Sequence, residues 1–137
     1  MVLFLQIGDQ GSVFGLVGGQ AAEWMEFSAD RNPFPGLSVI LERFGEERPL
    51  AVVCGQLAGD NPDFRASWSM GRTAVALANG LAFAWGVPVA ALETSGREDR
   101  KGLAESIRSA ALAAKPGEWI RAAYGGEPNI TEPREKS

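Results

Sequence analysis

Three short β-prone segments lie near the start of the chain. Residues 2–7 are apolar, residues 12–17 form a second apolar segment, and residues 22–27 alternate apolar with polar side chains. Turn clusters rich in glycine separate the three segments, which is the pattern of a three-stranded antiparallel meander. A loop with two prolines is expected over residues 28–36.

After this loop the apolar spacing becomes helical. Four apolar residues fall at i, i+3, i+4 and i+7: Leu37, Ile40, Leu41 and Phe44. The spacing predicts one face of a helix that ends at Gly45. The continuous apolar run at residues 50–54 is typical of a strand covered on both faces, and residues 55–64 are expected to form a polar loop.

The next segment predicts a long helix that ends near Trp85 and is capped by Ser67 or Ser69. One apolar stripe runs along it: Met70, Ala74, Leu77, Leu81 and Trp85. A second face carries small residues: Gly71, Ala78 and Ala82. A helix that is apolar nearly all round packs on two sides, so we expect a neighbouring backbone to come close to the small residues.

Residues 73–92 carry no charge and match the length of a membrane span. The sequence Gly86-Val87-Pro88 interrupts this stretch, and such a break ends a regular element. We therefore expect no membrane association. The stretch instead predicts a buried helix, a turn and a buried strand at residues 88–92.

A third helix is predicted after Ser95 and Glu98, whose spacing is that of a capping box. The full order is then three strands followed by alternating helices and strands. This order predicts an α/β domain with a five-stranded mixed sheet, built from a meander plus βαβα, and helices on its faces. We assign this domain to residues 1–122 and expect an extended or mobile tail at residues 123–137.

Composition narrows the possible functions of the 137-residue chain. Its net charge is −4, so a broad basic face for direct nucleic-acid binding is not expected. It contains no histidine, which removes the commonest general base and the histidine-dependent nucleophile arrangements. The single cysteine, Cys54, is consistent with a reducing compartment, and the N-terminal apolar run is short for a signal peptide. We therefore expect a cytoplasmic protein.

Two segments carry a resemblance to a known family. Residues 67–74 read SWSMGRTA and residues 80–88 read GLAFAWGVP. They resemble the TsaB (YeaZ) family, whose pattern there is roughly G-P-G-S-F-T-G-L-R-I-G and then G-L-A-x-A-x-x-I-P. The tail at residues 124–131, YGGEPNIT, is similar to the family's Y-x-R-x-P-x-I-T end. The resemblance implies one half of an actin-like, ribonuclease H-like fold.

The chain also departs from the family pattern. Gln6 stands where the superfamily has an aspartate, and Phe64-Arg65-Ala66 replaces the Gly-Pro-Gly of the motif. Glycines in such a loop allow a backbone to approach a phosphate. Full-length members also carry a second half-domain, which we do not expect in this chain. We therefore expect no cofactor, no metal site and no ATP–magnesium site.

The resemblance implies a non-catalytic function. TsaB is a partner of TsaD, the transferase of tRNA threonylcarbamoyladenosine modification, and the two pair through their first two helices. It implies a heterodimer with a TsaD-like transferase, a further contact with a TsaE-like ATPase, and a homodimer when the chain is alone. Apolar surface that a small sheet cannot cover supports the same interface. The expected partner-binding residues are Leu37, Ile40, Leu41, Phe44, Gly71, Ala74, Ala78, Leu81, Ala82 and Trp85.

An alternative function stays open, that of a small nucleotide- or phosphate-binding domain. Its candidate anion-binding residues are Ser67, Ser69 and Arg72 at the start of the second long helix. The competing interpretation is that the serines cap this helix and that Arg72 pairs with Asp60 or Asp63. The acidic residues Asp60, Asp63, Glu93 and Glu98 are interpreted as solvated rather than as a metal site. Cys54 is interpreted as a small core residue rather than a reactive thiol.

Overall fold

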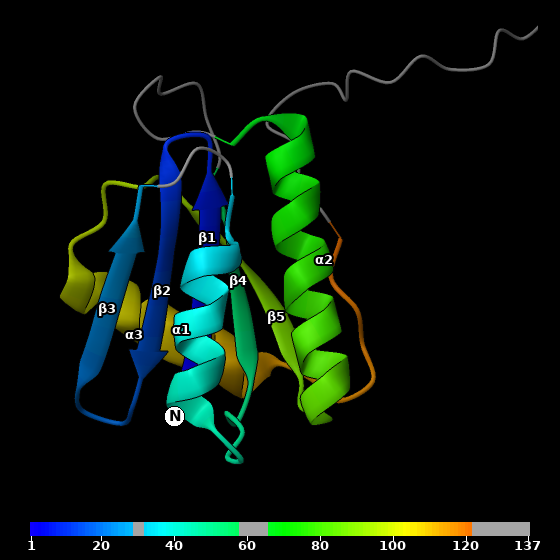
Figure 1. The fold of residues 1–137 in the computed structure, drawn as a ribbon. Coiled ribbons are helices and arrows are strands. Elements are labelled where there is room, and N and C mark those ends of the chain that lie inside the picture. The colour runs from blue at the N-terminus through cyan, green and yellow to red at the C-terminus, as the bar shows by residue number, and fades with distance from the viewer. Residues whose placement is uncertain (29–31, 58–65, 122–137) are drawn as a thin grey trace, which may run out of the picture.

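A computed structural model describes residues 1–28, 32–57 and 66–121, with Trp68 described by its backbone alone. Figure 1 shows the arrangement of the helices and strands. In chain order they are β1 (Val2–Gly8), β2 (Gly11–Val17), β3 (Ala22–Phe27), α1 (Phe34–Phe44), β4 (Val52–Leu57), α2 (Trp68–Trp85), β5 (Val89–Thr94) and α3 (Arg100–Ala113).

The five strands form one mixed sheet in the order β3-β2-β1-β4-β5. The first three strands are antiparallel neighbours, and β4 and β5 add in parallel to β1. Helices α1 and α2 cover one face of the sheet and α3 covers the other (Figure 1). The α/β architecture with a meander followed by βαβα is therefore confirmed.

Strand β1 contributes to two hydrophobic cores at once. Leu3 and Leu5 point into the core beneath α1 and α2, whereas Phe4 points into the core beneath α3. Alternate side chains of a strand point to opposite faces. Because helices cover both faces, β1 reads as a continuous apolar run rather than an alternating one.

Helix α1 begins at Phe34, whereas the sequence predicts its start at Leu37. The prolines that suggested a loop lie at the helix start, where proline is tolerated because the first amides have no helical partner. Gly36 allows α1 to lie close to the sheet. A Cβ at this position would lie 2.6 Å from the Phe14 ring.

Strand β4 runs from Val52 to Leu57, later than the predicted 50–54, and Leu50 is 72% exposed. The polar residues at its end belong to the strand because their backbones pair with β1 and β5. Helix α3 begins at Arg100 with Asp99 as its cap. Glu98 accepts hydrogen bonds from the backbone of Ser95 as expected, but the pair closes a turn before the helix.

Residues 114–121 leave α3 and reach the flank of α2 (Figure 1). The Asn79 side chain donates to the carbonyl of Ile120 at 3.0 Å and accepts from its amide at 3.1 Å. The Gln56 side chain donates to the carbonyl of Arg121 at 2.9 Å. We call residues 114–121 the strap. The predicted tail at residues 123–137 lies outside the described residues.

Candidate functional site

Helices α1 and α2 lie side by side on one face of the sheet (Figure 1). Their C-terminal ends touch, since the ring centroids of Phe44 and Trp85 are 5.3 Å apart. The surface between the helices is lined by apolar side chains. We call this the interhelical surface: Leu37 and Leu41 of α1, and Leu77, Leu81 and Trp85 of α2.

Two contacts orient these helices. Arg43 pairs with Glu23 of β3, so this flank of α1 faces the β3 edge of the sheet. Leu41 precedes Arg43 by two positions, about 200° around a helix of 3.6 residues per turn, and therefore faces α2. On α2 the Phe44 contact places Trp85 on the α1 side, and the strap contact places Asn79 on the opposite flank.

Five of the ten predicted partner-binding residues are buried in the chain's own core: Ile40, Phe44, Ala74, Ala78 and Ala82. Each is at most 8% exposed. They occupy the stripe at i, i+4 and i+8 that faces the sheet, so their side chains cannot contact a partner in the folded chain. The structure thus places these five in the core of the chain rather than on an accessible face.

The other five predicted residues remain accessible. Leu37, Leu81 and Trp85 are partly exposed, and Leu41 is 43% exposed. Gly71 is also partly exposed, with open space beside the position of a Cβ. The accessible members therefore concentrate on the interhelical surface.

Further large apolar side chains are exposed on other sides of the same two helices. Of the eight large hydrophobic residues exposed in the described part of the chain, four lie on α1 and α2: Phe34, Val39, Leu41 and Phe83. Phe83 is 75% exposed and stacks on Trp119 of the strap at a centroid distance of 6.1 Å. The helical layer thus exposes more large apolar side chains than any other part described.

The start of α2 brings two of the three candidate anion-binding residues, Ser67 and Ser69, near each other. The hydroxyl of Ser67 accepts from the Met70 amide at 3.3 Å, and its own amide donates to Asp9 at 2.9 Å. Ser67 therefore caps the helix, as the competing interpretation holds. Its hydroxyl also lies 3.3 Å from that of Ser69. Arg72 is exposed and engaged in an interaction of its own, and Asp60 and Asp63 lie outside the described residues.

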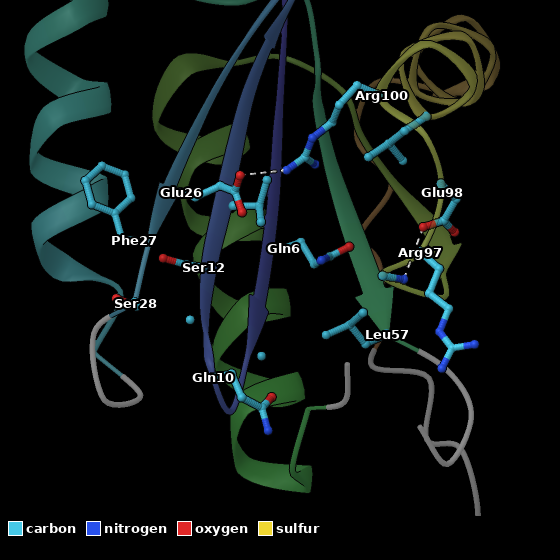
Figure 2. A pocket seen from close by; sticks show the side chains of 15 residues that line it. Gln6, Gln10, Ser12, Glu26, Phe27, Ser28, Leu57, Arg97, Glu98 and Arg100 are labelled. Atoms are coloured by element: carbon cyan, nitrogen blue, oxygen red, sulfur yellow. Dashed lines mark hydrogen bonds and ion pairs between the residues drawn. The ribbon is translucent and has the colours of Figure 1, made fainter. Parts of the chain in front are cut away.

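A cleft of about 340 Å³ opens at the carboxyl ends of β1 and β4, on the α3 side of the sheet. The β1–β2 turn, the end of β3 and the β5–α3 loop complete its walls. Figure 2 shows Gln6 near the middle of this cleft, with Arg100 and Arg97 towards opposite ends. The Gln6 carbonyl oxygen accepts from the Thr94 hydroxyl at 2.7 Å.

Similar proteins were found among solved structures alone. YeaZ from Pseudomonas aeruginosa aligns with a TM-score of 0.52 and 21% identity, over 67% of this chain and 43% of that chain. A protein described as similar to peptidase YEAZ from Pseudomonas aeruginosa gives 0.52 and 21%, over 67% and 42%. RuvC of T. thermophilus in complex with a Holliday junction gives 0.48 and 21%, over 84% and 98%. No protein-family model and no curated protein sequence matches the chain.

The chain has an actin-like, ribonuclease H-like fold. It spans less than half the length of the YeaZ structure that it matches.

In this actin-like sheet Gln6 lies near the carboxyl end of β1, opposite Gly55 of β4. A Cβ at Gly55 would lie 2.6 Å from the Phe4 ring and 3.2 Å from the Gln6 side-chain oxygen. Glycine at this position thus makes room for the Gln6 side chain. The sequence marks Gln6 only as a departure from the superfamily, and it gives no sign that Arg97 and Arg100 line the same cleft.

The remaining candidates from the sequence are the Cys54 thiol, a metal site and a membrane span. Cys54 is fully buried in β4, and burial raises the pKa of its thiol to about 12, so the interpretation as a core residue is confirmed. Within residues 1–28, 32–57 and 66–121, no three metal-ligating side chains gather where an ion could be held. No helix in these ranges has the length and hydropathy of a membrane span.

Proposed function

We propose that this chain is a non-catalytic adaptor that docks onto a TsaD-like transferase in tRNA threonylcarbamoyladenosine modification. The observation that carries the proposal is the interhelical surface, an apolar strip of accessible side chains on two neighbouring helices. The fold shared with YeaZ and the sequence resemblance in α2 support the choice of partner. In this proposal the chain contacts the transferase rather than the tRNA, and acts in the cytoplasm.

The chemistry of this surface suits association. Leucine side chains around an aromatic residue resemble the centre of a protein interface, where a few anchors carry most of the binding energy. Each square ångström of apolar area removed from water stabilises a complex by roughly 25 cal/mol, before the loss of translational freedom is subtracted. The proposal extends to a homodimer through the same surface when the transferase is absent, and to a TsaE-like ATPase as a further partner.

The test is co-purification of the full chain with a TsaD homologue, followed by size-exclusion chromatography. Leu41→Glu places a charge on the interhelical surface at a position already 43% exposed, so the fold is expected to tolerate it. Leu112→Glu is the matched control, because Leu112 is 88% exposed on α3, on the other side of the sheet. We expect Leu41→Glu to abolish the complex and Leu112→Glu to leave it intact.

Far-UV circular dichroism of both variants confirms that each is folded. Equal binding by both variants would show that the transferase contacts another surface. Failure of the wild-type chain to bind any TsaD homologue would remove the adaptor role altogether.

A further inference from the structure

The cleft at the ends of β1 and β4 lies where an open α/β sheet offers a natural binding position. From β1 the chain continues to β2 on one side of the sheet, and from β4 it continues to β5 on the other. The crevice outside the carboxyl ends of two such strands is a topological switch point, where ligands bind in sheets of this type. Its volume of about 340 Å³ is within the range of small-molecule sites.

The two carboxylates on the walls of the cleft and the side-chain oxygen of Gln6 already have partners, whereas the buried Ser12 hydroxyl has none among the described residues. The carboxylate of Glu26 pairs with Arg100 at 3.1 Å, and the two oxygens of Glu98 accept from the backbone amides of Ser95 and Gly96 (Figure 2). The side-chain oxygen of Gln6 accepts from Thr94. These carboxylate and amide oxygens are directed to partners within the protein, and the Ser12 hydroxyl alone is a poor ligand set for a hard cation.

Two hydrogen-bond donors on the same walls have no partner among the described residues, whereas Arg100 is paired with Glu26. Accepting from Thr94 fixes the Gln6 amide, and its NH₂ group has no partner among the described residues. The guanidinium of Arg97 likewise has no partner within the described ranges. Figure 2 shows both side chains beside Leu57, at the end of β4.

We propose that this cleft binds a small oxyanion, the phosphate or carboxylate group of a small molecule, without a metal ion. The ligand's oxygens would accept from the Gln6 amide and from the Arg97 guanidinium. Hydrogen bonds to an ionised group are about twice as strong as neutral ones, and a guanidinium matches the planar geometry of such groups. With its oxygen bound to Thr94, Gln6 presents a hydrogen-bond donor to the cleft at the end of β1.

The experiment titrates the full chain with sodium phosphate and with sodium succinate, in chelator-containing buffer at constant ionic strength. The readout is the ¹⁵N-resolved resonance of the Gln6 side-chain amide, which reports on this site alone. We expect a saturable shift with at least one of the two probes. Tighter binding of phosphate would indicate a phosphate ligand, and tighter binding of succinate would indicate a carboxylate ligand. Gln6→Glu keeps an oxygen for Thr94 but removes the donor, so it preserves the wall of the cleft and weakens binding roughly tenfold or more.

Arg97→Ala is expected to weaken binding to a similar extent, whereas Arg72→Ala at the start of α2 leaves it unchanged. The opposite pattern, lost binding in Arg72→Ala with full affinity in Gln6→Glu, would overturn the proposal and move the anion site to α2. The absence of any saturable shift with either probe would also overturn it.

Discussion

Cys54 shows how completely the central strands are enclosed. It lies on β4 between β1 and β5 and is 0% exposed. Burial disfavours the charged thiolate, which raises the thiol pKa from 9.0 to about 12. A cysteine held neutral in this way is inert, because the thiolate is the reactive form.

This shift predicts a dependence of stability on pH. The folded state keeps the Cys54 proton up to about pH 12, whereas the unfolded state releases it near pH 9.0. The contribution to the free energy of unfolding is therefore fully present below pH 9.0 and is lost as the pH rises towards 12. Denaturant titrations between neutral and alkaline pH check this. Cys54→Ala should lose stability less steeply than the wild type, and parallel curves would contradict the assignment.

Some single-residue roles could be predicted from sequence and others could not. The cap at Ser67 and the burial of Cys54 follow from residue type and the local pattern. Which side of α2 faces the sheet does not, because a helix that is apolar nearly all round gives no periodic signal for its inward face. Ala78 was for that reason predicted at the partner surface, although it is 0% exposed.

At the scale of elements, Asn79 is the residue that attaches the strap to α2. Its amide makes the same pair of hydrogen bonds with Ile120 that a neighbouring strand would make. Ile120 in turn packs against the core beneath α2. A side chain on a helix thereby holds a segment that contributes no regular structure of its own.

Asn79→Ala is expected to release the strap. Two lost hydrogen bonds correspond to about 1–2 kcal/mol of local stability, so the Ile120 amide should exchange its hydrogen faster. Asn79→Asp keeps the acceptor for this amide but loses the donor, and it should give an intermediate effect. Hydrogen-exchange mass spectrometry measures both. Unchanged protection at Ile120 in Asn79→Ala would show that packing alone holds the strap.

The order of the elements is predictable from the sequence, whereas several of their boundaries are not. The predicted β4 ends too early because Gly55 and Gln56 read as a turn, and only pairing with β1 and β5 keeps them in the sheet. The predicted α1 starts too late because its prolines resemble a loop. Both errors arise where a tertiary contact outweighs local preference.

On the scale of the whole molecule, the two cores share the strands between them. Leu3 and Leu5 belong to one core and Phe4 to the other, on the same strand. A small domain built in this way is expected to unfold in a single transition.

Ala78→Glu tests whether the domain unfolds in a single transition, with Ala76→Glu as the control. Ala78 is 0% exposed beneath α2, so a glutamate there buries an unpaired charge at a cost of about 3–5 kcal/mol. Ala76 lies on the exposed side of the same helix. We expect Ala78→Glu to lose cooperative thermal unfolding and Ala76→Glu to keep it. A folded Ala78→Glu variant that fails only in partner binding would show that Ala78 contacts the partner.

The strap has a consequence for the rim of the sheet. It starts from α3 behind the sheet and is fastened to α2 in front, so it must pass around β5, the outermost strand on that side (Figure 1). The unpaired backbone groups of an exposed edge strand can form hydrogen bonds with a strand of another chain, which is a route to ordered aggregates. By crossing in front of that rim, a stretch of chain with no regular structure helps to keep neighbouring copies from polymerising edge to edge.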